Sequence, residues 1–138
     1  AGGVYVHSLE PRDGSMSEIQ CTTALPADFE RDAFARVGEM HITPNGRWLY
    51  VAVRSVNALA AFKVDDESGR ITLTGHYPVG EEPRGFNIDA RGRYLIANGR
   101  RSRTSETYMI NRETGALTKL AESKTSGPPD WIEIVELP

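Results

Sequence analysis

Four polar side chains have the types and positions from which a site for an anionic molecule could be built. His41 and Asn87 each lie between apolar residues of a predicted strand, while Arg54 and Arg84 lie at predicted strand ends. A guanidinium can bond two oxygens of a phosphate or carboxylate at once. A histidine, whose ordinary pKa is about 6.5, can activate water near neutral pH. These residues predict a site in which His41 is the catalytic base and Arg54, Arg84 and Asn87 bind the substrate.

An internal repeat predicts the elements that position these residues. A pattern of apolar, glycine, arginine and proline positions recurs 46 residues later, and a third round begins at Ile132. The repeated pairs are Ile42 and Ile88, Gly46 and Gly92, Arg47 and Arg93, Leu49 and Leu95, Gly69 and Gly115, Thr72 and Thr118, and Pro83 and Pro129. A period of this length, filled with strand patterns, is typical of β-propeller blades, which are four-stranded antiparallel sheets.

The boundaries of the repeat predict an all-β fold that is an incomplete part of a propeller. Residues 1–26 would form the two outer strands of one blade, 37–80 and 84–125 two full blades, and 130–138 the inner strand of a fourth. Residues 27–36 are interpreted as a loop between blades. Closed propellers carry about four to eight blades. Either upstream blades are therefore missing from the chain, or several chains self-associate to complete the ring.

Aligned copies of the inner strand place polar residues near the predicted axis. The equivalent apolar sets are Met40, Phe86 and Ile132, and Ile42, Ile88 and Ile134. Strand alternation would pack both sets against a neighbouring blade. Between them lie His41, Asn87 and Glu133, also equivalent. Such unlike polar groups indicate a site, and the alternative is that each satisfies a local backbone group.

Composition argues against several other classes of function. The formal net charge of -3 argues against nucleic acid as the main partner. No apolar run approaches the roughly 18 residues of a membrane helix, so no membrane partner is predicted. The three histidines and the single Cys21 lack metal-ligand spacing, so neither a metal nor another cofactor is predicted. One cysteine suits a reducing compartment, which favours the cytoplasm. Trp48 and Trp131 are interpreted as core anchors.

Three stretches resemble a known enzyme family. HITPNGRWLYVAVR, ITLTGHYPVGEEPRGFNIDARGRYLIANG and GPPDWIEIVELP are similar to the C-terminal part of the seven-bladed β-propeller lactonases, a family of bacterial 6-phosphogluconolactonases that includes the fungal carboxymuconate-lactonising enzyme. The resemblance implies hydrolysis of 6-phospho-D-glucono-1,5-lactone, a small anionic sugar lactone, to 6-phosphogluconate in the pentose phosphate pathway, without a metal.

The same resemblance assigns three of the candidate residues. His41 matches the family's histidine before its T-P-D-G turn, Arg54 the arginine after its Y-x-x-x strand, and Arg84 the arginine of its P-R-G-F segment. ANGRRSRTSE departs from the family's usual A-x-G-Q-x-S-H, so Arg100 is not carried over. The family's acidic and histidine partners on upstream blades have no counterpart here, so the resemblance does not imply activity for the isolated chain.

Two other functions stay open at the level of sequence. The first is a lactonising isomerase, in which the same arginines would bind the carboxylates of a muconate. The second is a non-enzymatic propeller segment that acts as a binding or assembly surface, because exposed blade edges invite pairing with another chain.

Overall fold

Strands make up nearly all of the regular structure. The computed structural model describes residues 2–30 and 34–135. The strands are β1 (Gly3–Leu9), β2 (Met16–Thr23), β3 (Val37–Ile42), β4 (Trp48–Val53), β5 (Ala58–Val64), β6 (Ile71–Pro78), β7 (Pro83–Ile88), β8 (Tyr94–Gly99), β9 (Thr104–Ile110) and β10 (Leu117–Lys124). A single 3₁₀ turn, η1 (Arg54–Val56), follows β4 in the described part of the chain.

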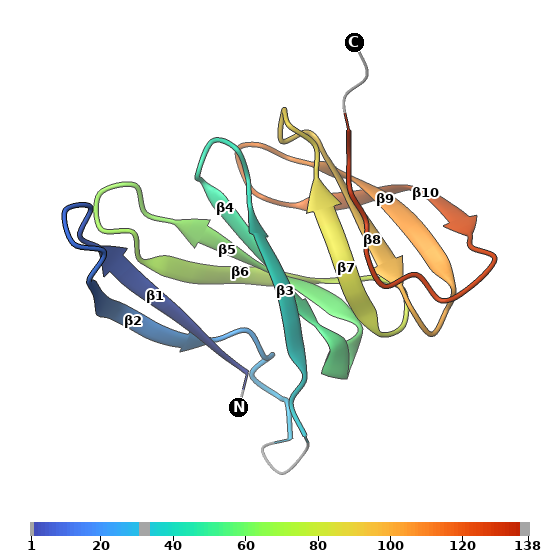
Figure 1. The fold of residues 1–138 in the computed structure, drawn as a ribbon. Coiled ribbons are helices and arrows are strands. Elements are labelled where there is room, and N and C mark those ends of the chain that lie inside the picture. The colour runs from blue at the N-terminus through green and yellow to red at the C-terminus, as the bar shows by residue number, and fades with distance from the viewer. Residues whose placement is uncertain (1, 31–33, 136–138) are drawn as a thin grey trace.

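The strands form three antiparallel sheets that lie side by side (Figure 1). The first sheet pairs β1 with β2, the second runs β3-β4-β5-β6, and the third runs β7-β8-β9-β10. The innermost strands β3 and β7 are neighbours at the centre of Figure 1, and the outer strands fan away from them. The predicted all-β fold of four-stranded blades is confirmed.

A tight turn shows how the repeated residues build a blade. Between β3 and β4 the amide of Gly46 donates to the carbonyl oxygen of Thr43 at 2.8 Å. Gly46 has a φ of +72°, which a residue without a Cβ adopts without strain. The recurring glycine of the sequence repeat is therefore explained by the hairpin that each blade needs.

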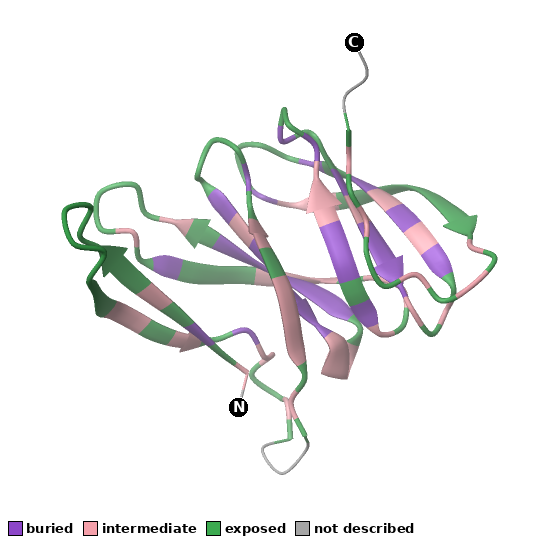
Figure 2. Cartoon of the chain, viewed as in Figure 1, coloured by how far each residue is buried: buried purple, intermediate pink, exposed green. Residues whose placement is uncertain are grey.

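Two hydrophobic clusters fill the spaces between adjacent sheets. Their buried residues are coloured purple in Figure 2. Alternation along β4 points Tyr50 and Ala52 toward the third sheet and Val51 and Val53 toward the first. Trp48 is buried in the cluster shared with the third sheet, so its predicted role as a core anchor is confirmed.

Three apolar residues lie elsewhere than the sequence predicts. Met40 and Ile42 are 48% and 53% exposed, whereas Phe86, the counterpart of Met40, is buried. The first sheet packs on β4, β5 and β6 and does not cover the side chains of Met40 and Ile42. Trp131 is 71% exposed, which contradicts its interpretation as a core anchor. Its segment is held by its backbone, because the carbonyl oxygen of Trp131 accepts a bond from Asn98 Nδ2 at 3.0 Å.

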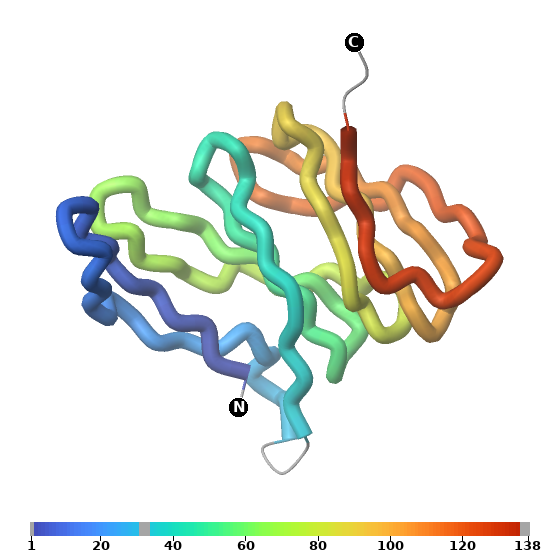
Figure 3. Tube along the Cα trace, viewed as in Figure 1, coloured from blue at the N-terminus to red at the C-terminus, as the bar shows by residue number. Residues whose placement is uncertain are grey.

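The predicted last inner strand also differs from expectation. Residues 126–135 carry no strand assignment, and 136–138 lie outside the described residues. A strand is defined by its ladder, and no described strand is paired with this segment. Figure 3 shows the segment, in red, running beside β7, in yellow. We keep the inner strand of a fourth blade as a proposal for this segment, and with it the other predicted blade boundaries.

Two buried tyrosines should make the stability of the fold depend on pH in the alkaline range. The hydroxyl of Tyr50 donates to the carbonyl oxygen of Gly115 at 2.8 Å, and burial raises the pKa of Tyr50 above its ordinary value near 10. Burial, and then the hydrogen bond to Glu106, raise the pKa of Tyr108 in the same direction. The folded chain therefore keeps both phenols protonated at pH values where the unfolded chain ionises them.

We expect the stability contributed by these tyrosines to be complete below about pH 10 and to fall as the pH rises further. The free energy of unfolding should drop by up to about 1.4 kcal/mol per pH unit for each titrating tyrosine. Urea unfolding between pH 9 and 11.5 measures this slope, and the variant Tyr50→Phe should lose one tyrosine's share. An unchanged slope in Tyr50→Phe would contradict the role given to this residue.

Candidate functional site

A cavity of about 430 Å³ opens where the loops between blades meet. Its walls come from the β2–β3 loop, η1, the β8–β9 loop and residues 79–82 between β6 and β7, which we call the crossover. The lining residues are Phe29, Phe34, Arg36, Arg54, Ser55, Asn57, Glu81, Glu82 and Arg101. Three arginines and two carboxylates make this cavity strongly polar. A second hollow, which includes Asn45, Arg47, Lys63 and Asp66, lies at the opposite strand ends of the same blade.

Arg54 lies in the wall of this cavity and not in bulk water. The antiparallel pairing of Val37 with Val53 brings the residue after β4 beside the start of β3. Arg54 Nη2 donates to the carbonyl oxygen of Val37 at 3.3 Å. A Cβ on Gly38 would lie 3.3 Å from Arg54 Nε, so the glycine leaves room for the guanidinium. The Nε–H is buried and has no acceptor among the described residues, which is uncommon for a buried donor.

His41 forms a pair with Glu39, a residue that the sequence analysis did not identify. His41 Nε2 and Glu39 Oε1 are 3.0 Å apart, and both side chains are partly buried. The other carboxylate oxygen, Oε2, accepts a bond from the backbone amide of Phe86 at 3.0 Å. The imidazole meets the Phe86 ring edge-on, with the ring centroids 5.0 Å apart. The carboxylate and the aromatic ring together fix the orientation of the histidine. The signal in the sequence is a two-residue spacing, which puts both side chains on one face of a strand.

Arg54 lies beside the start of β3, whereas His41 lies near its end. A β-bulge between Val37 and Met40 interrupts the alternation of the strand where Gly38 adjoins Arg54 and where Glu39 bonds to β7 and to His41. His41 does not line the cavity that Arg54 lines. A molecule that touches both residues would have to extend from the cavity along β3 to His41.

Arg84 is engaged in ion pairs. Its Nε lies 3.6 Å from Glu82 Oε1 and 3.7 Å from Asp130 Oδ1. Arg100 shares the same two carboxylates, with Nη1 3.6 Å from Glu82 Oε2 and Nε 2.9 Å from Asp130 Oδ1. We call these four residues the crossover ion-pair cluster. Arg84 does not line the cavity itself, whereas its ion-pair partner Glu82 does.

Asn87 bonds to backbone groups at both ends of its amide. Its Nδ2 donates to the carbonyl oxygen of Ile132 at 3.4 Å, and its Oδ1 accepts from the amide of Ile88 at 2.7 Å. These contacts favour the alternative that the side chain satisfies local backbone. A role in substrate binding stays a prediction.

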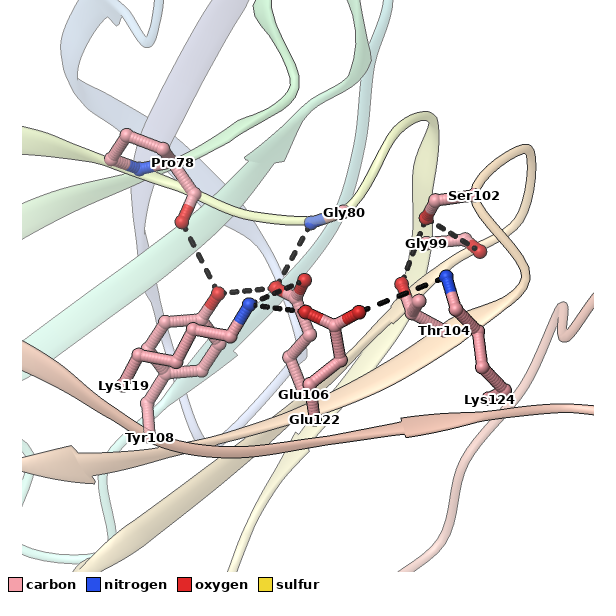
Figure 4. Close-up of polar contacts among 10 residues, drawn as sticks. All are labelled: Pro78, Gly80, Gly99, Ser102, Thr104, Glu106, Tyr108, Lys119, Glu122 and Lys124. Atoms are coloured by element: carbon pink, nitrogen blue, oxygen red, sulfur yellow. Dashed lines mark hydrogen bonds and ion pairs between the residues drawn. The ribbon is translucent and has the colours of Figure 1, made fainter.

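A buried glutamate holds the crossover in place (Figure 4). Glu106 Oε2 accepts the amide of Gly80 at 3.0 Å and the hydroxyl of Tyr108, and Oε1 accepts Lys119 Nζ at 2.9 Å. The hydrogen bonds to Glu122 and Glu106 raise the pKa of Lys119. Gly80 also lies against Gly99, where a Cβ on Gly80 would come within 3.0 Å of the Gly99 Cα. This network fixes the segment that carries Glu81 and Glu82 into the cavity.

In residues 2–30 and 34–135, no group of three His, Cys, Asp or Glu side chains is arranged to hold a metal ion. No helix in that part of the chain has the length and apolar character needed to span a bilayer.

Comparison with known protein families gives a match over nearly the whole chain. A family model described as lactonase, 7-bladed β-propeller, matches residues 1–134. A curated 6-phosphogluconolactonase of Pectobacterium carotovorum is 39% identical over 134 residues, which are 97% of this chain and 40% of that protein. One of Yersinia pestis is 42% identical over 131 residues, 95% of this chain and 39% of its own. The chain thus spans about 40% of the length of the curated relatives that it matches.

Solved structures agree with this match. A candidate 6-phosphogluconolactonase of Bacteroides fragilis superimposes with a TM-score of 0.87 at 28% identity, covering 98% of this chain and 36% of the other. The periplasmic gluconolactonase of Pseudomonas aeruginosa gives 0.89 at 26% identity, covering 99% and 38%. The prediction that these blades are part of a seven-bladed propeller is confirmed.

Proposed function

The chain belongs to the seven-bladed β-propeller lactonase family, and we propose that its blades form part of an enzyme that hydrolyses 6-phospho-D-glucono-1,5-lactone to 6-phosphogluconate in the pentose phosphate pathway. The observation that carries this proposal is the guanidinium of Arg54, which lines a polar cavity together with Arg36 and Arg101. A guanidinium fits a phosphate or lactone oxygen. The names of the curated relatives support the choice of substrate.

In the proposed mechanism, water attacks the lactone carbonyl carbon and the ring oxygen leaves as a hydroxyl group. His41 accepts the proton from the attacking water and donates it to the departing ring oxygen, and Glu39 holds the imidazole in the orientation that these transfers need. Arg54 binds the phosphate or the lactone oxygen from the cavity beside the start of β3. The substrate would therefore extend from the cavity along this strand to His41. Arg84 contributes to anion binding only after its carboxylate partners release it.

A coupled assay tests the proposed reaction. The chain, and a chimaera in which it replaces the matching segment of the Pectobacterium relative, are given the phosphorylated lactone, and 6-phosphogluconate is detected with its dehydrogenase. Release of product above the spontaneous rate by the chimaera supports the proposal. If the folded chimaera instead consumes carboxymuconate, seen as a loss of absorbance, the lactonising isomerase would replace the hydrolase as the proposed function.

The pair on β3 gives a separate prediction. In the chimaera, Glu39→Gln should lower kcat by about 10- to 100-fold and leave KM nearly unchanged, because an amide does not hold the imidazole as a carboxylate does. The double variant with His41→Asn should be little worse than His41→Asn alone, since the two residues act as a unit. Fully additive losses, or an unchanged kcat in Glu39→Gln, would remove Glu39 from the mechanism.

We also propose that the protein acts in the cytoplasm, where phosphorylated sugars are made and the single Cys21 stays reduced. The relative from Pseudomonas aeruginosa is described as periplasmic, so cell fractionation is the deciding measurement. Sedimentation of the purified chain tests the self-association that its exposed Met40 and Ile42 would favour.

A further inference from the structure

Glu82 occupies a backbone conformation that glutamate rarely adopts. Its φ is +56°, in the left-handed region that favours glycine. The conformation is held from both sides, because the amide of Glu82 donates to Asn57 Oδ1 at 2.9 Å and its carbonyl oxygen accepts the amide of Arg100 at 3.2 Å. Strained residues that their surroundings hold in place are concentrated at functional sites. These two bonds fix the backbone from which the Glu82 side chain projects.

That side chain puts a carboxylate between two arginines. Glu82 Oε1 is 3.6 Å from Arg84 Nε, and Oε2 is 3.6 Å from Arg100 Nη1. Asp130 approaches the same guanidiniums, so two positive and two negative charges cancel in the crossover ion-pair cluster. The Glu82 contacts are longer than the 2.7–2.9 Å of charge-assisted hydrogen bonds. The side chains of Arg84 and Arg100 also remain 43% and 38% exposed, although the Nε of Arg100 is itself buried.

We propose that Glu82 is a specificity-determining residue that acts as a built-in competitor for incoming anions. Its carboxylate occupies Arg84 and Arg100 until an anion of higher charge, such as a phosphate dianion, displaces it. Weakly charged ligands are thereby excluded while a phosphate dianion can still enter. The inference rests on the proposed function for its place in catalysis, and on the ion pairs alone for its effect on anion binding.

Removal of the charge should therefore strengthen binding, which is the opposite of what loss of a ligand contact does. In Glu82→Gln, inorganic phosphate and 6-phosphogluconate should each bind about three- to tenfold more tightly at low ionic strength. The gain should shrink at 0.5 M salt, where surface charges are screened. It should also disappear in the double variant Glu82→Gln/Arg84→Ala. Dissociation constants come from NMR titration of the 138-residue chain.

The matched control is Glu81→Gln, which makes the same charge change in the neighbouring residue of the same cavity wall. In the described part of the chain, Arg84 and Arg100 form ion pairs with Glu82 and Asp130 and not with Glu81, so this substitution should tighten phosphate binding less than twofold. Glu82→Gly, which also relieves the positive φ, should tighten binding like Glu82→Gln and guards against a folding defect in one variant.

The outcomes separate this inference from the proposed function. Tighter binding in both Glu82 variants, dependent on Arg84, supports the inference even if no lactone is hydrolysed. Equal gains in Glu81→Gln and Glu82→Gln, or unchanged or weaker binding in folded Glu82→Gln, would overturn it even if the chimaera is an active lactonase.

Discussion

Gly115→Ala should lower the free energy of unfolding by about 3 kcal/mol. Gly115 ends the turn between β9 and β10 with a φ of +69°. A Cβ built there would lie 2.3 Å from Cε3 of Trp48, which belongs to the neighbouring blade. The indole cannot yield easily, because it is buried and its Nε1 donates to the carbonyl oxygen of Arg112 at 3.0 Å. The added methyl group therefore strains both the turn and the packing between blades.

The repeat supplies a matched control for this effect. Gly69 is the counterpart of Gly115 one blade earlier and has nearly the same φ, +70°. The nearest atom to its added Cβ is Ile19 Cδ1 at 3.9 Å, an ordinary contact. Gly69→Ala should therefore cost only the backbone strain, about 1 kcal/mol. Urea unfolding of both variants separates the two contributions. Equal losses would show that Trp48 does not pack on Gly115 as described.

Arg54→Ala should lower kcat/KM for the phosphorylated lactone by about 100-fold in the chimaera, a loss of about 2.7 kcal/mol in transition-state stabilisation. Removal of the guanidinium leaves the anion in this cavity without its bidentate partner. If Arg54 binds the phosphate, unphosphorylated gluconolactone should be hydrolysed at nearly the same rate by the variant and the parent. If it binds the lactone oxygen, both substrates should suffer alike.

The control for Arg54 is an arginine of the same blade at the opposite strand ends. Arg47 is exposed and lines the second hollow. Arg47→Ala removes the same charge and should change kcat/KM less than twofold, because exposed charges at that distance are screened. An Arg54→Ala variant that folds and keeps the parent's kcat/KM would remove this residue from the site.

The repeat in the sequence was sufficient to predict the blades. Recurrence of Gly46 and Gly92 depends on a local turn, and the alternation of β4 depends on the period of a strand, so both are readable without knowledge of the partner sheet. The exposure of Met40 and Trp131 was not predicted, because it depends on which surfaces other segments cover. The local sequence pattern determines whether a segment forms a strand or a turn, whereas the burial of its side chains depends on the segments that pack against it.

The site was predicted only in part for the same reason. Arg54 could be proposed from its position after a strand, but its buried Nε–H depends on room left by Gly38 in another strand. Glu39 was missed because its role arises from the backbone amide of Phe86, which belongs to the next blade. Glu82 was missed because neither its φ nor its arginine partners can be recognised from neighbouring residues in the sequence.

The central claim is that an anionic sugar ligand binds where β3 meets the loops between blades. NMR titration of the isotope-labelled 138-residue chain with 6-phosphogluconate tests it most directly. The largest amide shifts should fall at Arg36, Arg54 and Ser55 and along β3 at Glu39 and His41. Shifts confined to the second hollow around Arg47 and Lys63, or no shifts at millimolar ligand, would contradict it.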